Sequence, residues 1–450
     1  MHMVEVPKDA IDDGECISRA LCAFIRACPS PFHTVQEIRS RLDRAGFQFI
    51  SESWDWEIRR GGAYYTIRNG SSIIAFRVGS HVRLPRFGMA ISHGDSPTYR
   101  VKAVPELKGP KDIMRINVEG YGGTIDRTWL DRPLSVAGRV MVRQTNGAAC
   151  ILYAPDEDLL LIPSLAIHLD REVNQQGQIN KQNDICALFS AGALGEGAFL
   201  QTVASHLGVD QSQILSYDLT LVNRQESVVW GAAKEFVSAP RLDDLQCAYA
   251  SLEGFLAAEN ERSIAVYACL NNEEVGSSTM QGALSTFVSD VLKRVCACLG
   301  VGVSEYKRSI ARSFVVSCDN AHAVHPNHPE RYDEQNRAWL NKGVVIKESA
   351  NQRYTTDAVS HAFFKLICER ANVPTQCFSN RSDMPGGSTL GNLLTHQVSM
   401  RSVDVGLPQL AMHSSYETAG TADAAYLARA LREFYDSDYL FLDDGSFELS

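Results

Sequence analysis

The fold of this chain is decided by the stretch Tyr267-Ala-Cys-Leu-Asn-Asn-Glu-Glu-Val-Gly-Ser277. The apolar run 264–270 predicts a short buried strand, because it contains β-branched residues and ends at two asparagines, which favour turns. Two adjacent carboxylates, Glu273 and Glu274, follow directly. Neighbouring side chains at a strand end point in different directions, so one glutamate can hold a cation while the other handles a proton. Taken alone, this stretch favours a solvated acidic turn. Whether it is a turn or part of a metal site depends on which residues follow the other strands.

The composition is that of an ordinary globular protein. At 450 residues, with 45% apolar and 21% charged residues, the chain can form two or three domains. Its formal net charge of −10 argues against non-specific nucleic-acid binding, and no apolar run reaches the roughly 18–20 residues that a membrane helix needs. Residues 1–7 lack the pattern of a secretion signal, and the 12 cysteines form no Cys-x-x-Cys pair. We therefore expect reduced cysteines and a cytoplasmic protein.

The N-terminal part has the alternation of helices and strands that is typical of α/β proteins. Hydrophobic periodicity predicts helices over 14–28 and 34–46, and strands over 72–78 and 87–92. We expect Thr34 to cap the second helix, with Glu37 three residues further on.

From residue 104 this alternation stops. The segment that follows contains short strand-like pieces separated by Gly-rich turns such as Gly120-Tyr-Gly-Gly123. The strand-like pieces are 115–118, 139–143 and 149–153. We interpret 104–236 as an inserted, mostly β domain that interrupts a catalytic domain formed by 1–103 and 237–450.

The α/β alternation resumes near residue 236. Apolar spacing over 245–256 predicts an amphipathic helix, for which Asp243 or Asp244 could be the cap. A further apolar strand over 313–318 ends at Asp319, and strand-like segments after residue 402 lead to His413.

A histidine also stands at an earlier strand end. The strand over 87–92 runs directly into His93, and Asp95 follows two residues later. A carboxylate close to a metal-bound imidazole fixes its tautomer and ring orientation. A single His-x-Asp is equally common in ordinary turns.

Five side chains with metal-binding groups thus follow apolar strands or begin a helix: His93, Asp243, Glu274, Asp319 and His413. Because ligand sites in open α/β sheets form beyond the carboxyl ends of strands, these side chains can converge. Two imidazoles and three carboxylates suit zinc or a similar ion. Five ligands suit two ions that share one carboxylate and activate a water for hydrolysis, which would leave Glu273 as general base and Asp95 to orient His93. Spacing alone leaves scattered structural residues as the alternative.

Collinear motifs over nearly the whole chain resemble the aspartyl aminopeptidase family, which belongs to the zinc-peptidase clan of the tetrahedral aminopeptidases. The matching motifs are Ser92-His-Gly-Asp-Ser-Pro97, Tyr121-Gly-Gly123, Thr128-Trp-Leu-Asp-Arg-Pro133, Pro163-Ser-Leu-Ala-Ile-His-Leu169, Ser238-Ala-Pro-Arg-Leu-Asp243, Asn272-Glu-Glu-Val-Gly276, Ala321-His-Ala-Val-His-Pro-Asn327, Ile346-Lys347, Ala350-Asn-Gln-Arg-Tyr354 and Asp404-Val-Gly-Leu-Pro-Gln-Leu-Ala-Met-His-Ser414. Two positions depart from the family pattern: Asn271, often Asp, and Gly386, often Cys. Neither departure removes a metal ligand or a catalytic group.

The resemblance implies a three-layer α/β/α metallopeptidase domain with an inserted, mostly β dimerisation domain. It implies two divalent ions per subunit, most often zinc, with cobalt or manganese as alternatives. One ion would be held by His93, Asp243 and Asp319, and the other by Asp243, Glu274 and His413. Asp243 would be the bridge, Glu273 the general base and Asp95 the orienting carboxylate. The resemblance also implies a cis peptide bond between Asp243 and Asp244.

The resemblance further implies substrate-binding roles for residues outside the metal site. His322, Lys347 and Tyr354 match positions that line the substrate pocket, and His168 matches a position that reaches the site of a neighbouring subunit. The implied activity is removal of an N-terminal Asp or Glu from peptides by a cytoplasmic enzyme that assembles from homodimers into a homododecamer.

Two alternative functions, from different classes of protein, compete with the aminopeptidase. A deacylase or carboxypeptidase of the same clan would keep the metals and change the pocket. A catalytically inactive peptide-binding scaffold is the second, but it would have no need for a base beside a complete ligand set.

Specificity for acidic residues needs a local cause. The net charge of −10 repels an acidic peptide, and the carboxylates of the metal site favour a cationic α-amine instead. We therefore expect a cation in the substrate pocket, and Lys347 is the candidate.

Overall fold

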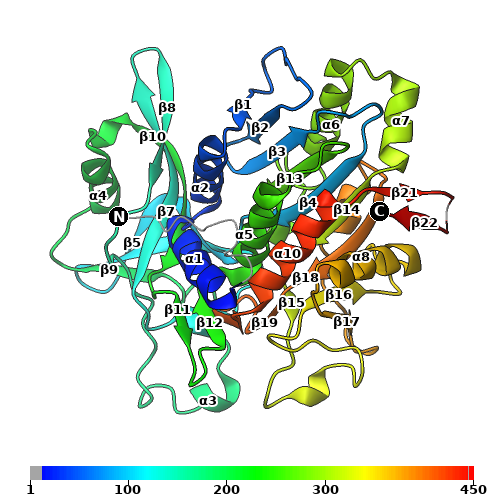
Figure 1. Cartoon of the computed structure of the whole chain (residues 1–450). Helices are drawn as coiled ribbons and strands as arrows, with labels where there is room; N and C mark the ends of the chain where they lie inside the picture. Colours follow the sequence, from blue (N-terminus) through cyan, green and yellow to red (C-terminus); the bar gives the residue numbers. More distant parts are fainter. Residues whose placement is uncertain (1–12, 444) are drawn as a thin grey trace.

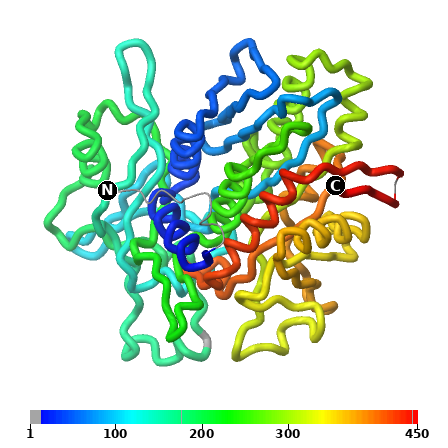
Figure 2. The backbone as a smooth tube through the Cα atoms, in the orientation of Figure 1, coloured from blue at the N-terminus to red at the C-terminus, as the bar shows by residue number. Residues whose placement is uncertain are grey.

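The computed structural model describes residues 13–443 and 445–450. Segment 1–7, where no secretion signal is expected, lies outside the described residues. Within the described part, every helix is too short or too polar to span a bilayer. Figures 1 and 2 show a large mixed α/β body and, beside it, a second body made mostly of strands.

The large body is organised around a nine-stranded sheet. Its order is β1 (Gln48–Phe49), β2 (Ala63–Arg68), β3 (Ser72–Val78), β13 (Ile264–Leu270), β4 (Phe87–His93), β14 (Phe314–Cys318), β18 (Arg401–Gly406), β16 (Val344–Glu348) and β17 (Thr375–Ser379). The strands expected over 72–78, 87–92, 264–270 and 313–318 are thereby confirmed, each to within one residue. Strands β13, β4, β14 and β18 run parallel, so their carboxyl ends meet at one edge of the sheet.

Helices cover both faces of this sheet, which confirms the three-layer α/β/α architecture. Each helical layer packs into its own hydrophobic cluster against the sheet. One layer contains α1 (Gly14–Ala27), α2 (Pro31–Arg44), α5 (Leu242–Ala257), α8 (Ala358–Arg370) and α10 (Asp423–Asp436). The other contains α6 (Phe287–Cys298), α7 (Val303–Ala311) and α9 (Leu390–Leu394).

Two local expectations about helices were wrong. Helix α2 begins at Pro31 and not at Thr34, because the fixed φ angle of proline suits the first helical position. Thr34 is not a cap, and its hydroxyl donates to the Ser30 carbonyl.

Helix α5 forms as expected but is not amphipathic. It lies between the main sheet and α10 and is buried on nearly all sides. Its N-terminal cap position is Arg241, so the carboxylates of Asp243 and Asp244 are free for other contacts.

The second body is built on a six-stranded antiparallel sheet formed by 98–223. Its order is β8 (Gly147–Tyr153), β7 (Leu134–Gln144), β10 (Ile214–Asn223), β5 (Thr98–Lys108), β6 (Ile113–Tyr121) and β9 (Ala187–Ala191). It contains only the helices α3 (Val173–Gln176) and α4 (Ala198–Leu207) beside a 3₁₀ turn at each of two connections. A separate core that includes Tyr99, Trp129 and Phe199 holds it together. We refer to it below as the inserted sheet.

A third, five-stranded sheet joins segments from distant parts of the sequence. Its order is β11 (Val228–Trp230), β12 (Phe236–Ala239), β20 (Glu417–Gly420), β19 (Pro408–Leu410) and β15 (Ala321–His322). The loop between β19 and β20 carries His413, and β12 leads into α5 and Asp243. This sheet therefore fixes two of the candidate ligands relative to each other. Near the end of the described residues, β21 (Tyr439–Phe441) pairs antiparallel with β22 (Phe447–Leu449).

Candidate metal centre

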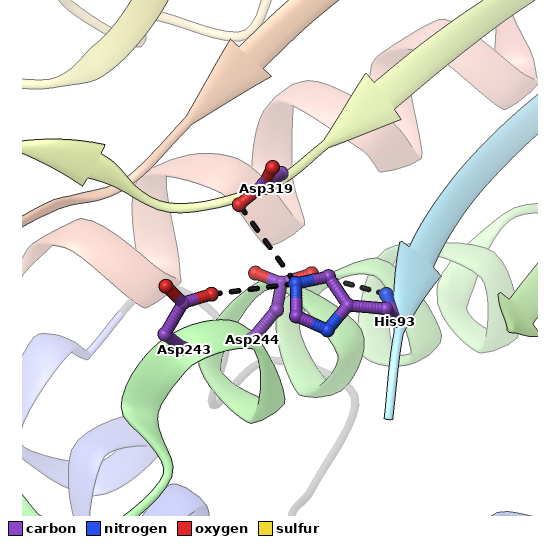
Figure 3. A group of neighbouring side chains, drawn as sticks. All are labelled: His93, Asp243, Asp244 and Asp319. Carbon is purple, nitrogen blue, oxygen red and sulfur yellow. Dashed lines mark hydrogen bonds and ion pairs between the residues drawn. The ribbon is translucent and has the colours of Figure 1, made fainter. Parts of the chain in front are cut away.

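A buried cluster of one histidine and three aspartates lies at the edge of the main sheet where the parallel strands end. It contains His93 at the end of β4, Asp243 and Asp244 at the start of α5, and Asp319 after β14 (Figure 3). One ligand atom from each lies within 4.8 Å of the others. The Nε2 atom of His93 faces Asp243 Oδ1 at 3.4 Å and Asp319 Oδ1 at 3.9 Å.

A second cluster shares Asp243 with the first. Nε2 of His413 lies 3.5 Å from Oδ2 of Asp243 and 3.4 Å from Oε2 of Glu274. The two oxygens of Asp243 thus face two different imidazoles, Oδ1 towards His93 and Oδ2 towards His413. A carboxylate placed in this way can bridge two ions that each have further ligands of their own.

The donor atoms of these clusters fit zinc. Oδ1 of Asp243 and Oε1 of Glu274 are buried and accept no hydrogen bond from any described residue. Buried carboxylate oxygens normally have a partner, and a cation supplies one. The set contains imidazoles and carboxylates without a thiolate, which suits a hydrolytic zinc site and not a structural one.

The electrostatics of the cluster reflect its crowded charges. Burial opposes ionisation of Asp243, yet the imidazoles of His413 and His93 lower the pKa of its carboxyl. Burial would also lower the pKa of His413, but the carboxylates of Asp243 and Glu274 raise it to about 10. For Glu273 burial dominates and raises the pKa to about 8.

Asp95 connects His93 to the turn that carries both glutamates. The Nδ1 atom of His93 lies 3.0 Å from the Asp95 carbonyl and 3.5 Å from its Oδ1, so Nδ1–H donates here and Nε2 faces the cluster. The backbone N–H groups of Glu273 and Glu274 donate to the two carboxylate oxygens of Asp95, each at 3.2 Å. Glu273 lies close to His93 and Glu274 in a third group of potential ligands.

Two carboxylates of the centre were not identified from the sequence. Asp244 was considered only as a helix cap; it is buried and accepts the N–H of His93 at 3.2 Å (Figure 3). Glu417 accepts the backbone N–H of Asp243 at 3.1 Å and that of His413 at 2.7 Å. The only sequence signal for Asp244 was its position next to Asp243, and we see none for Glu417. The peptide bond between Asp243 and Asp244 is cis, as expected.

The three expected pocket residues lie on strands and loops next to the centre. Lys347 is 3% exposed on β16, and its Nζ donates to the Asn320 carbonyl at 2.8 Å and lies 3.8 Å from Asp319 Oδ2. The same Nζ lies 5.5 Å from the ring centroid of Tyr354. Although burial opposes its charge, Asp319 raises the pKa of Lys347. His322 on β15 is an exposed residue, yet the protein packed around its ring and the charge of Lys347 lower its pKa.

His168 is the one candidate that the fold does not bring to the centre. It lies between β8 and β9 on the inserted sheet, in an exposed segment. Its neighbours in the sequence are exposed apolar residues, with Leu165 67%, Ile167 50% and Leu169 77% accessible.

Comparison with known proteins places this geometry in a family. The profile of the family "Aminopeptidase I zinc metalloprotease (M18)" matches residues 24–435. The "Probable M18 family aminopeptidase 2" of Clostridium novyi is 41% identical over 426 residues, covering 92% of this chain and 98% of that protein. The protein of the same name in Pseudomonas aeruginosa is 39% identical over 431 residues, covering 94% and 99%.

Solved structures agree with the sequence relatives. A chain of the cryo-EM structure of the Ape4 and Nbr1 complex superimposes with a TM-score of 0.90 at 35% identity, covering 97% of this chain and 88% of that chain. The mApe1 dodecamer of S. cerevisiae superimposes with a TM-score of 0.82 at 27% identity, covering 94% and 96%. With this profile match, these identities and the buried histidine–carboxylate cluster, the chain belongs to the M18 family of zinc metalloaminopeptidases.

Proposed function

We propose that this chain is a two-metal aminopeptidase that removes an N-terminal Asp or Glu from peptides. The observation that carries the two-metal part is the orientation of Asp243, whose two oxygens face His93 and His413 separately. His93, Asp243 and Asp319 would hold one ion, and Asp243, Glu274 and His413 the other. Zinc is the expected ion, and cobalt or manganese could replace it because the donor set is the same.

Glu273 is proposed as the general base. Bound divalent ions would polarise the scissile carbonyl and make a water acidic enough to lose a proton near neutral pH. Glu273 would accept that proton and pass it to the leaving amine, while Asp95 holds the turn that carries Glu273.

The preference for an acidic residue rests on Lys347. Its ammonium is the cation that lies within 3.8 Å of Asp319 and is shielded from solvent. An ammonium has three N–H donors, and the bond to the Asn320 carbonyl uses one of them. The remaining N–H groups can donate hydrogen bonds to a substrate carboxylate. Tyr354 and His322 are proposed to form the adjacent walls of the pocket.

Self-association is proposed through the inserted sheet, with residues 104–236 as a dimerisation domain. The exposed apolar residues on either side of His168 supply a surface that a second copy would cover. His168 would then reach the centre of that neighbouring subunit. By analogy with the dodecameric mApe1, we propose a homododecamer.

A panel of peptides tests the proposed activity. The panel contains peptides that differ only in an N-terminal Asp, Glu, Ala or Leu, each with a free and an acetylated α-amine, assayed with zinc, cobalt and manganese. We expect cleavage of free Asp and Glu peptides and none of the acetylated ones. Cleavage of acetylated peptides would instead indicate a deacylase or carboxypeptidase, and no cleavage with any metal would indicate a scaffold.

A further inference from the structure

The inserted sheet contacts the metal centre directly, through three consecutive residues. Tyr121 is the last residue of β6 and contacts Asp95, which orients His93. Gly122 and Gly123 follow it and lie against Glu274 and His413 of the second cluster. We call this segment the strap. We propose that the strap positions both halves of the metal centre, with Tyr121 as the positioning residue for Asp95. This inference rests on the metal site proposed above.

The first contact is a directional chain of hydrogen bonds that ends on Asp95. Thr279 and Gln281 donate to the side-chain oxygen of Asn272 at 2.9 and 2.7 Å, which fixes the orientation of its amide. The amide nitrogen of Asn272 then donates to the Tyr121 hydroxyl at 2.9 Å. That hydroxyl has one proton, and it donates the proton to Oδ2 of Asp95 at 2.7 Å. Tyr121 therefore acts on the same carboxylate that accepts the N–H groups of Glu273 and Glu274.

The second contact acts on His413. Its Nδ1 donates to the Gly123 carbonyl at 2.8 Å, which leaves Nε2 facing Asp243 and Glu274. The N–H of Ile125 donates back to the His413 carbonyl at 3.0 Å. The strap thus fixes the ring orientation of His413 in the same way that the Asp95 carbonyl fixes that of His93.

Gly122 makes the close approach possible. Its φ is +72°, and a Cβ added here would lie 3.1 Å from Cβ and 3.4 Å from Oε2 of Glu274. A side chain at this position would therefore push the strap away from a proposed ligand. Beside the strap, the main body and the inserted sheet are separated by a cavity of about 310 Å³ whose lining includes Tyr121, Asp95 and Asn272. Next to this cavity, the hydrogen bonds of Tyr121 connect the strap to Asp95 and Asn272 of the main body.

Two pairs of variants test the strap, each with a control from the inserted sheet. Tyr121→Phe is matched by Tyr217→Phe, since the hydroxyl of Tyr217 donates to the Lys102 carbonyl at 2.6 Å on the same sheet. Gly122→Ala is matched by Gly208→Ala, where φ is +67° and no atom lies within 4 Å of an added Cβ. The controls carry the same chemical change and a similar backbone strain without touching the centre.

The readouts are zinc affinity, from competition with a chromogenic chelator, and the visible spectrum of the cobalt-loaded protein. We expect Tyr121→Phe and Gly122→Ala to bind zinc about tenfold more weakly than their controls and to shift the cobalt bands. Thermal unfolding of the metal-free proteins should not separate the two members of a pair. Equal zinc affinity and equal spectra within either pair would overturn the proposal. If Tyr121→Phe does not fold, the glycine pair decides.

Zinc competition uses no peptide, so it separates this inference from the proposed function. A wild-type protein that binds zinc but leaves acidic peptides intact would contradict the proposed specificity and still leave the strap testable.

Discussion

The backbone N–H of Glu273 donates to Oδ1 of Asp95 at 3.2 Å, so the proposed base is held by the same residue that orients His93. The position of Glu273 therefore depends on Asp95 and the turn and does not require its own carboxylate. A substitution that changes only the side-chain chemistry should leave the site assembled.

Glu273→Gln should retain its metal and lose turnover. The amide has nearly the same shape but cannot accept the proton, so we expect kcat to fall by about a hundred- to ten-thousandfold. Metal content by atomic emission and kcat from steady-state assays check this together. Near-normal turnover would assign the base to another residue, and loss of metal would make Glu273 a ligand.

Lys347→Met should change specificity more than overall activity. Removing a charge-assisted hydrogen bond of roughly 1.5–3 kcal/mol predicts a ten- to hundredfold loss of kcat/KM on an N-terminal Asp peptide. Cleavage of a Leu peptide should stay the same or rise, because the pocket becomes apolar. Lys342→Met, an exposed lysine that precedes β16, is the charge-matched control. Equal losses on Asp, Ala and Leu peptides would show that Lys347 is not the selector.

His168 should act in a neighbouring subunit. His168→Ala and Glu273→Gln, dissociated and reassembled together, should recover activity that neither has alone, because a hybrid contains sites with both groups intact. Mixing Glu273→Gln with Asp243→Ala is the control, since both changes lie in one subunit's own centre and a hybrid gains no intact site. No recovery in the test mixture, or equal recovery in both mixtures, would refute the role of His168.

Removing the metals should destabilise the folded chain. Without the proposed ions, the four carboxylates of Asp243, Asp244, Glu274 and Asp319 would lie close together with no metal cation between them. A ligand present at a thousandfold its dissociation constant stabilises the folded state by about 4 kcal/mol. We expect chelation to lower Tm by several degrees in thermal unfolding of the wild type. The Asp243→Ala variant should already unfold at the lower temperature and not respond to chelator.

Strand ends were the part of the site that the sequence could predict. Apolar runs before His93, Glu273 and Asp319 are local signals, and parallel strands bring their carboxyl ends to one edge. The contact between Tyr121 and Asp95 had no such signal, because it joins a strand of one sheet to a loop of another. The sequence also could not predict that α5 is buried on nearly all sides. This burial depends on α10, which lies far from α5 in the sequence and packs over it.

Zinc titration of the metal-free chain tests the central claim, that Asp243 bridges two ions, most directly. Isothermal calorimetry at neutral pH should show two equivalents of zinc per wild-type chain, because two histidine–carboxylate clusters share that residue. In Asp243→Ala both equivalents should be lost or greatly weakened together. A single equivalent in the wild type, or one full-affinity equivalent that survives in Asp243→Ala, would contradict the bridge.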